Sequence, residues 1–94
     1  MAHERVLAQL RERIRTREYV LTLHAEEEMN ADAFSIFDVE RAVLTGVILE
    51  VQRDRESGER KYRLRGSSRS DRLVEMVAKL GATGRMIIIT VYEP

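Results

Sequence analysis

The sequence lacks cysteine and tryptophan, has a single proline and contains no long hydrophobic run. Without cysteine, the chain cannot form a disulfide, a thiolate nucleophile or a zinc–thiolate site. No apolar stretch approaches the length needed to span a bilayer, and the N-terminus shows no apolar segment typical of a signal peptide. We therefore expect a cytoplasmic protein without a membrane partner.

The sequence also has no excess of charge of either sign, because 16 basic and 16 acidic residues give a formal net charge of zero. A protein that coats DNA is usually strongly basic, so the composition disfavours that class. The charges are nevertheless polarised along the chain. Most acidic residues precede Gly46, whereas Arg and Lys crowd residues 52–72. A local basic surface therefore remains compatible with the neutral total.

Helical patterns dominate the first half of the chain. Val6, Leu7, Leu10 and Ile14 recur at helical spacing and predict a helix near 3–16. The β-branched stretch "YVLTL" that follows fits a brief extended segment. "HAEEEM" then predicts a short second helix whose Ala25 and Met29, four residues apart, face the core.

The third predicted helix, near 36–45, carries the clearest local signals. Ser35 is a favourable N-cap, and Asp38 three residues later completes a capping-box pattern. Gly46 follows the last periodic apolar residue, where we expect it to adopt the left-handed conformation that ends many helices.

From Val47 onward the hydrophobic period changes from 3.6 to 2, which indicates strands. Four strands are predicted, and the last, 86–92, is apolar enough to lie in the sheet interior. The predicted fold is α+β, with N-terminal helices packed on a four-stranded antiparallel sheet. We expect one domain over 1–94, with the helices in residues 1–46 and the sheet in residues 47–94.

Alternation along the strands assigns side chains to the two faces of the predicted sheet. The face toward the helices would hold Val47, Leu49, Val51, Tyr62, Leu64, Val74, Met76, Ala78, Ile87, Ile89 and Val91. The other face would hold Glu50, Gln52, Lys61, Arg63, Arg65, Glu75, Lys79, Ile88, Thr90 and Tyr92. Such a face offers cations, a hydroxyl and an aromatic ring to RNA. Alternating polar positions are also what the solvated side of an antiparallel sheet looks like.

His24 stands where the extended segment meets three consecutive glutamates. An imidazole can serve as a general acid or base, or it can cap a helix and hydrogen-bond within the fold. A metal site is not expected, because Glu26 to Glu28 with the terminal His3 do not form a closed ligand set. The sequence also has no glycine-rich phosphate loop, serine-nucleophile elbow or paired-carboxylate pattern, so no cofactor is expected.

Several segments taken together resemble a family of small bacterial proteins of unknown function. They are "LHAEEEM", "FSIFDVERAVLTGVILE", "KYRLRG", "MVAKL" and "IIITVY". The family's recurring features are a His-Ala pair opening a short helix, an acidic residue starting the next helix and a glycine closing it. A final Thr-Val-Tyr strand completes the pattern, and the resemblance covers roughly 17–92.

The resemblance extends to RelE- and MqsR-type toxins of the barnase-like ribonuclease superfamily, and it implies a two-layer fold and metal-independent RNA cleavage. It points to His24, Lys79, Thr90 and Tyr92 as catalytic residues and to Arg63 and Arg65 as RNA phosphate contacts. The implied partners are RNA and a cognate zinc-finger antitoxin-like protein, and the chain would be a monomer or weak homodimer. The alternative is a non-catalytic protein- or RNA-binding module of the same fold.

Overall fold

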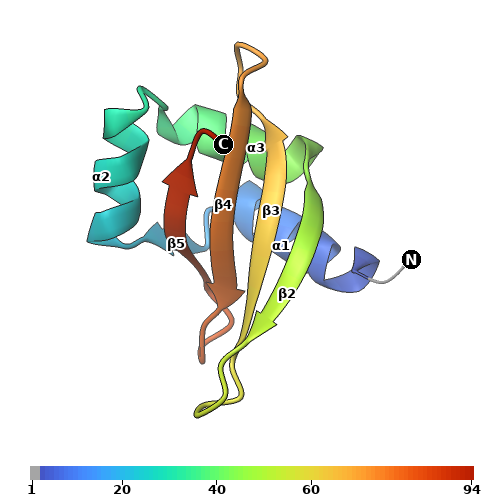
Figure 1. Ribbon diagram of the computed structural model, residues 1–94. Coiled ribbons are helices and arrows are strands. Elements are labelled where there is room, and N and C mark those ends of the chain that lie inside the picture. The colour runs from blue at the N-terminus through green and yellow to red at the C-terminus, as the bar shows by residue number, and fades with distance from the viewer. Residues whose placement is uncertain (1–2) are drawn as a thin grey trace.

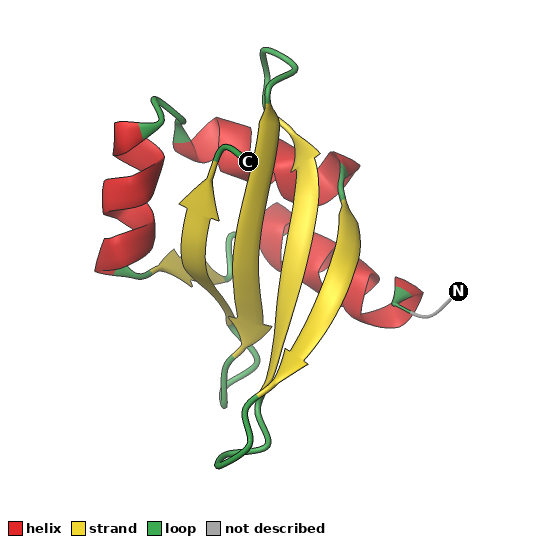
Figure 2. Cartoon of the chain, in the orientation of Figure 1, coloured by secondary structure: helices red, strands yellow, loops and turns green. Residues whose placement is uncertain are grey.

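Helices precede most of the strands in residues 3–94, the range that the computed structural model describes (Figures 1 and 2). The elements are α1 (Glu4–Arg15), β1 (Tyr19–Leu21), α2 (Leu23–Ala31), α3 (Ile36–Thr45), β2 (Val47–Arg53), β3 (Arg60–Ser67), β4 (Leu73–Leu80) and β5 (Met86–Tyr92). The predicted α+β class is confirmed. None of the helices in this described range is long and apolar enough to cross a membrane.

The helices form where the apolar spacing predicts them. In α1, Leu10 and Ile14 are buried on one face. In α2, Ala25 is buried and Met29 packs against the core, as expected from their spacing. The helix begins earlier than His24, because the hydroxyl of Thr22 caps it by accepting a hydrogen bond from the amide of Ala25.

The predicted N-terminal cap of α3 is confirmed, but the predicted backbone conformation of Gly46 at its C-terminal end is not. Ser35 and Asp38 form both hydrogen bonds of a capping box. The prediction of a left-handed Gly46 is wrong, because its φ of −93° and ψ of −179° describe extended backbone. A Cβ at Gly46 would lie 2.5 Å from the carbonyl oxygen of Arg65, so glycine is needed for close approach of α3 to β3.

The sheet has five strands in the order β1-β5-β4-β3-β2, so β5 lies in its interior as predicted. The prediction of four antiparallel strands is wrong, because β1 pairs in parallel with β5. Tyr19 lies opposite Met86 and Leu21 opposite Ile88. This pairing occupies backbone groups along an edge of β5 that would otherwise be unpaired. As Figure 1 shows, α1 and α3 cover one face, while α2 stands beside β5.

A bulge in β2 corrects the predicted facing of that strand. Ile48 lies opposite Leu64, but the next aligned pair is Glu50 with Arg63, which leaves Leu49 as an extra residue. Ile48 therefore packs against the core, whereas Val47, predicted to face the helices, is 56% exposed. Leu49, also predicted on the helix side, is exposed at the bulge.

A second bulge, at Ile89 in β5, has the same effect. Ile88 lies opposite Ala78 and Thr90 opposite Val77, so the alternation restarts after Ile89. Ile88 and Val91 are fully buried. The predictions that Ile87 and Ile89 face the helices and that Ile88 faces away are therefore wrong, while those for Val91, Thr90 and Tyr92 agree with the pairing.

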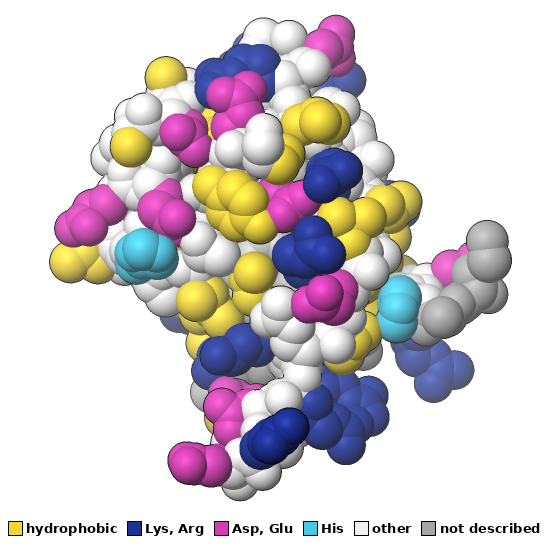
Figure 3. Space-filling model, in the orientation of Figure 1, with side chains coloured by type: hydrophobic (Ala, Val, Ile, Leu, Met, Phe, Trp, Pro, Cys, Tyr) yellow, Lys and Arg dark blue, Asp and Glu magenta, His cyan; other side chains and the backbone are white. Residues whose placement is uncertain are grey.

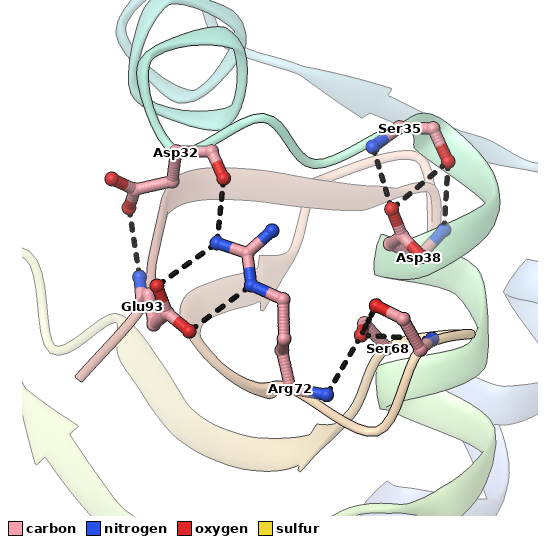
Figure 4. Close-up of polar contacts among 7 residues, drawn as sticks. Asp32, Ser35, Asp38, Ser68, Arg72 and Glu93 are labelled. Atoms are coloured by element: carbon pink, nitrogen blue, oxygen red, sulfur yellow. Dashed lines mark hydrogen bonds and ion pairs between the residues drawn. The ribbon is translucent and has the colours of Figure 1, made fainter.

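The loop between β3 and β4 is anchored to the α2–α3 junction and to the end of β5 (Figure 4). The buried hydroxyl of Ser68 accepts hydrogen bonds from loop amides, including that of Arg72 at 3.0 Å. The guanidinium of Arg72 contacts both carboxylate oxygens of Glu93 and the carbonyl of Asp32, and it lies 4.2 Å above the Phe34 ring. Arg72 therefore has a structural role in holding the C-terminal end of the sheet.

Candidate functional site

The candidate site lies on the sheet face away from α1 and α3, which we call the open face and define by Arg63, Arg65, Glu75, Thr90 and Tyr92. Cross-strand pairing places Arg65 beside Glu75 and Glu75 beside Tyr92. Basic and acidic side chains are intermixed over the strands in Figure 3 rather than gathered in one continuous basic patch. The cations of the open face are therefore interspersed with acids and do not form a separate basic surface.

A carboxylate that is almost completely buried organises the centre of this face. Glu75 is only 3% exposed. Its Oε1 accepts hydrogen bonds from Arg65 Nε at 2.9 Å and Nη2 at 2.7 Å. Its Oε2 lies 3.3 Å from Arg63 Nη1 and accepts a hydrogen bond from the Tyr92 hydroxyl. Arg63 also contacts Glu50, with 3.5 Å between Nη2 and Oε2. Both predicted phosphate contacts are thus already paired with acids.

The network shifts the pKa values of Glu75 and Tyr92 in opposite directions. Burial alone would raise the pKa of Glu75, but hydrogen bonds from Tyr92 and Arg65 and the positive charges of Arg65 and Arg63 lower it below its usual range. The hydrogen bond to Glu75, with burial and the negative charge, raises the pKa of Tyr92. At neutral pH the cluster therefore holds a carboxylate and a protonated phenol.

A second polar cluster joins α2 to β5 at the rim of the open face. His24 is exposed, with 67% of its side chain accessible, and its Nε2 lies 3.1 Å from Oε1 of Glu28. The same oxygen accepts hydrogen bonds from the Thr90 hydroxyl and from the backbone amide of Val91, the latter at 3.3 Å. Glu28 thus connects the imidazole to the strand that also carries Tyr92.

The two clusters lie close to each other because Thr90 and Tyr92 alternate on one strand. Residues two apart on a strand point to the same face and stand about 7 Å apart. Lys79, the fourth predicted catalytic residue, lies nearer the β2–β3 hairpin, opposite Ile87. Its Nζ binds the carboxylate of Glu59 at 3.0 Å, so the structure does not bring Lys79 into either cluster.

Sequence reasoning did not assign a site role to Glu28 and Glu75, the two glutamates that hold these clusters together. The run of three glutamates is typical of a solvated helix face, although the position of Glu28 four residues after His24 is a usable signal. Glu75 was placed on the correct face, but alternation gives no information about which cations meet it across the sheet. In the described range, no three His, Asp or Glu side chains gather as a metal-binding group.

Comparison with known proteins identifies the chain at the level of a family. Residues 21–93 match the family described as "Domain of unknown function (DUF4258)", and this range contains α2, α3, β2 to β5 and every predicted site residue. Neither the curated proteins nor the solved structures gave a match. The resemblance to RelE- and MqsR-type toxins therefore stays a prediction. Because the match spans well over half of the chain, the protein belongs to the DUF4258 family.

Proposed function

We propose that the protein cleaves RNA on the open face without a metal, by attack of a ribose 2′-hydroxyl on the adjacent phosphate. The observation that carries this proposal is the pair of linked clusters. An exposed imidazole held by Glu28 stands at the rim of the face. Arg63, Arg65 and Tyr92 surround Glu75 at its centre. Acid–base groups and cations are the two components that such a reaction requires.

In the proposed reaction, His24 accepts the proton of the 2′-hydroxyl as this oxygen attacks phosphorus. The bond from phosphorus to the 5′-oxygen breaks, which leaves a 2′,3′-cyclic phosphate on one fragment. Tyr92, protonated at neutral pH, donates the proton that the departing 5′-oxygen takes up. Arg63 and Arg65 stabilise the extra negative charge on the phosphate in the transition state. Glu28 orients His24, and Lys79 would contact a neighbouring phosphate only after leaving Glu59.

The test is cleavage of an end-labelled RNA by purified protein in the presence of a chelator. We expect His24→Ala to lower the cleavage rate by roughly 10²–10⁴-fold, the usual contribution of one general acid or base. Glu27→Ala is the matched control, because Glu27 is an exposed residue of the same helix. Circular dichroism should show that both variants are folded. Wild-type protein that leaves RNA intact, or His24→Ala protein that cleaves at the wild-type rate, would refute the catalytic role.

The neutralised arginines favour a second candidate function, a binding module without catalysis. Arg63 and Arg65 already have carboxylate partners, so the face is stable without a phosphate ligand. In that case the open face would bind RNA or a protein, and His24→Ala would leave this binding unchanged. Neither the wild type nor the His24→Ala variant would then produce a cleavage product. Filter binding and the cleavage assay on the same RNA distinguish the two functions.

A protein partner related to zinc-finger antitoxins is also proposed, and the edge strand β2 supports an attachment by strand addition. This edge is unpaired among the described strands, and it exposes the apolar side chains of Val47 and Leu49. Co-expression with the product of the neighbouring gene, followed by copurification, tests this. A Val47→Lys variant should lose the partner, whereas Arg85→Gln, on a different hairpin, should keep it.

A further inference from the structure

A pocket lies on the opposite side of the sheet from the proposed cleavage site. It has a volume of about 410 Å³, within the range of small-ligand sites. The first turns of α1 contribute His3, Arg5 and Val6, and the β2–β3 hairpin contributes Val51, Arg60 and Tyr62. In Figure 1 the N-terminal end of α1, which carries part of this lining, extends past β2 at the edge of the sheet.

Among the described residues that line this pocket, the ionisable side chains are basic, and Gln9 adds a neutral amide. Two guanidinium groups and an imidazole line it, and no carboxylate does. Within residues 3–94, no carboxylate forms an ion pair with Arg5 or Arg60. The nearest acids in the hairpin are engaged elsewhere. Asp54 accepts hydrogen bonds from hairpin amides, and Glu59 binds Lys79.

A like-charged pair that includes Arg60 stands at the edge of the pocket. Arg53 and Arg60 are directly opposite each other in the β2–β3 ladder. Like charges in this position destabilise a sheet unless an anion or solvent screens them. An anion between these side chains would relieve their repulsion.

The remaining walls of the pocket suit a flat apolar group. Tyr62 presents an aromatic ring, and Val6 and Val51 add aliphatic surface. A nucleobase is planar and stacks on aromatic side chains. We propose that this pocket binds a nucleoside 5′-phosphate, with the phosphate on Arg5 and Arg60 and the base against Tyr62. The inference is independent of the proposed RNA cleavage, which uses other residues on the other face.

Isothermal titration calorimetry with adenosine 5′-monophosphate tests this inference. We expect saturable binding that Arg60→Gln weakens roughly tenfold, the value of one charge-assisted contact. Arg85→Gln should bind like wild type, because Arg85 is an exposed arginine of a different hairpin, outside the pocket. Ribose 5-phosphate, which lacks the base, should bind about 5- to 150-fold more weakly, as expected for loss of one stacked base.

The same ligand chemistry occurs as a free nucleotide and at the 5′ end of a nucleic acid strand. A 5′-phosphorylated oligodeoxynucleotide distinguishes these sources, and it lacks the 2′-hydroxyl that the proposed cleavage needs. Binding of either phosphorylated probe supports the site, and the tighter probe identifies its occupant. Absence of saturable binding by both probes would overturn the proposal. Equal losses in Arg60→Gln and Arg85→Gln, or equal binding of a 5′-hydroxyl oligodeoxynucleotide, would overturn it as well.

Discussion

Replacement of Glu75 by glutamine tests how the open face is held together. The side chain keeps its size but loses its charge and one acceptor oxygen. In the wild-type protein, Glu75 accepts two hydrogen bonds from Arg65 and one from Tyr92, and it pairs with Arg63. A glutamine must point its amide group toward either a guanidinium, which cannot accept a hydrogen bond, or the phenol of Tyr92, which could accept one only after its own hydroxyl hydrogen turns away.

The expected loss follows from the burial of each partner. Removing the charged partner of a hydrogen bond typically costs about 1.5–3 kcal/mol. Arg65 is 43% exposed, so water replaces some of the lost interaction there. The phenol and the position of Glu75 itself are better shielded. We therefore expect Glu75→Gln to lower the free energy of unfolding by about 2 kcal/mol, equivalent to about 8–16 °C in the melting temperature of a domain this size.

The loss of stability caused by Glu75→Gln should become smaller as the pH falls. The pKa of Glu75 in the folded protein lies below its usual range, whereas in the unfolded chain it should be about 4.3. The ionised carboxylate therefore stabilises the fold above that unfolded value, and this contribution is lost as the pH falls through the folded pKa. The stability gap between wild type and Glu75→Gln should be full at neutral pH and should shrink in acid.

Urea unfolding followed by circular dichroism measures the difference in stability between wild type and Glu75→Gln. The measurement is made at pH 7 and at about pH 3, which lies below the pKa of glutamate in an unfolded chain. Glu27→Gln serves as the control, because it removes the same charge from an exposed position of α2. Equal effects of the two substitutions at pH 7 would refute the reasoning. A gap for Glu75→Gln that stays constant into acid would show that the charge is not what stabilises the cluster.

Three further predictions concern the fold. Gly66→Ala should unfold the protein or cost about 3 kcal/mol or more in urea titrations, because its Cβ would lie 2.7 Å from the carbonyl carbon of Ala42. Ser35→Ala should lower the free energy of unfolding by about 1 kcal/mol through loss of the α3 cap. Burial and the hydrogen bond to Glu40 raise the pKa of Tyr19 to about 12, so its stabilising contribution should vanish as the pH rises through that value. Tyr19→Phe should remove the corresponding step from an ultraviolet titration.

Local patterns in the sequence determined the helices, the number of later strands and the interior position of β5. The capping box of α3 illustrates why, because Ser35 and Asp38 form it with atoms only three residues apart. The same holds for His24 and Glu28, which meet because residues four apart share a helix face. Alternation also placed Arg63, Arg65, Thr90 and Tyr92 on one sheet face, since consecutive strand side chains point to opposite sides.

Only the tertiary structure decided which partners these side chains meet. The bulges at Leu49 and Ile89 reverse the alternation within single strands, and the register of the neighbouring strands fixes their positions. The parallel pairing of β1 joins residues 19–21 to 86–88, and no local pattern encodes such a contact. Glu75 neutralises Arg63 and Arg65 because β4 and β3 pair in this register, so the charge of the open face is a property of strand pairing and not of composition.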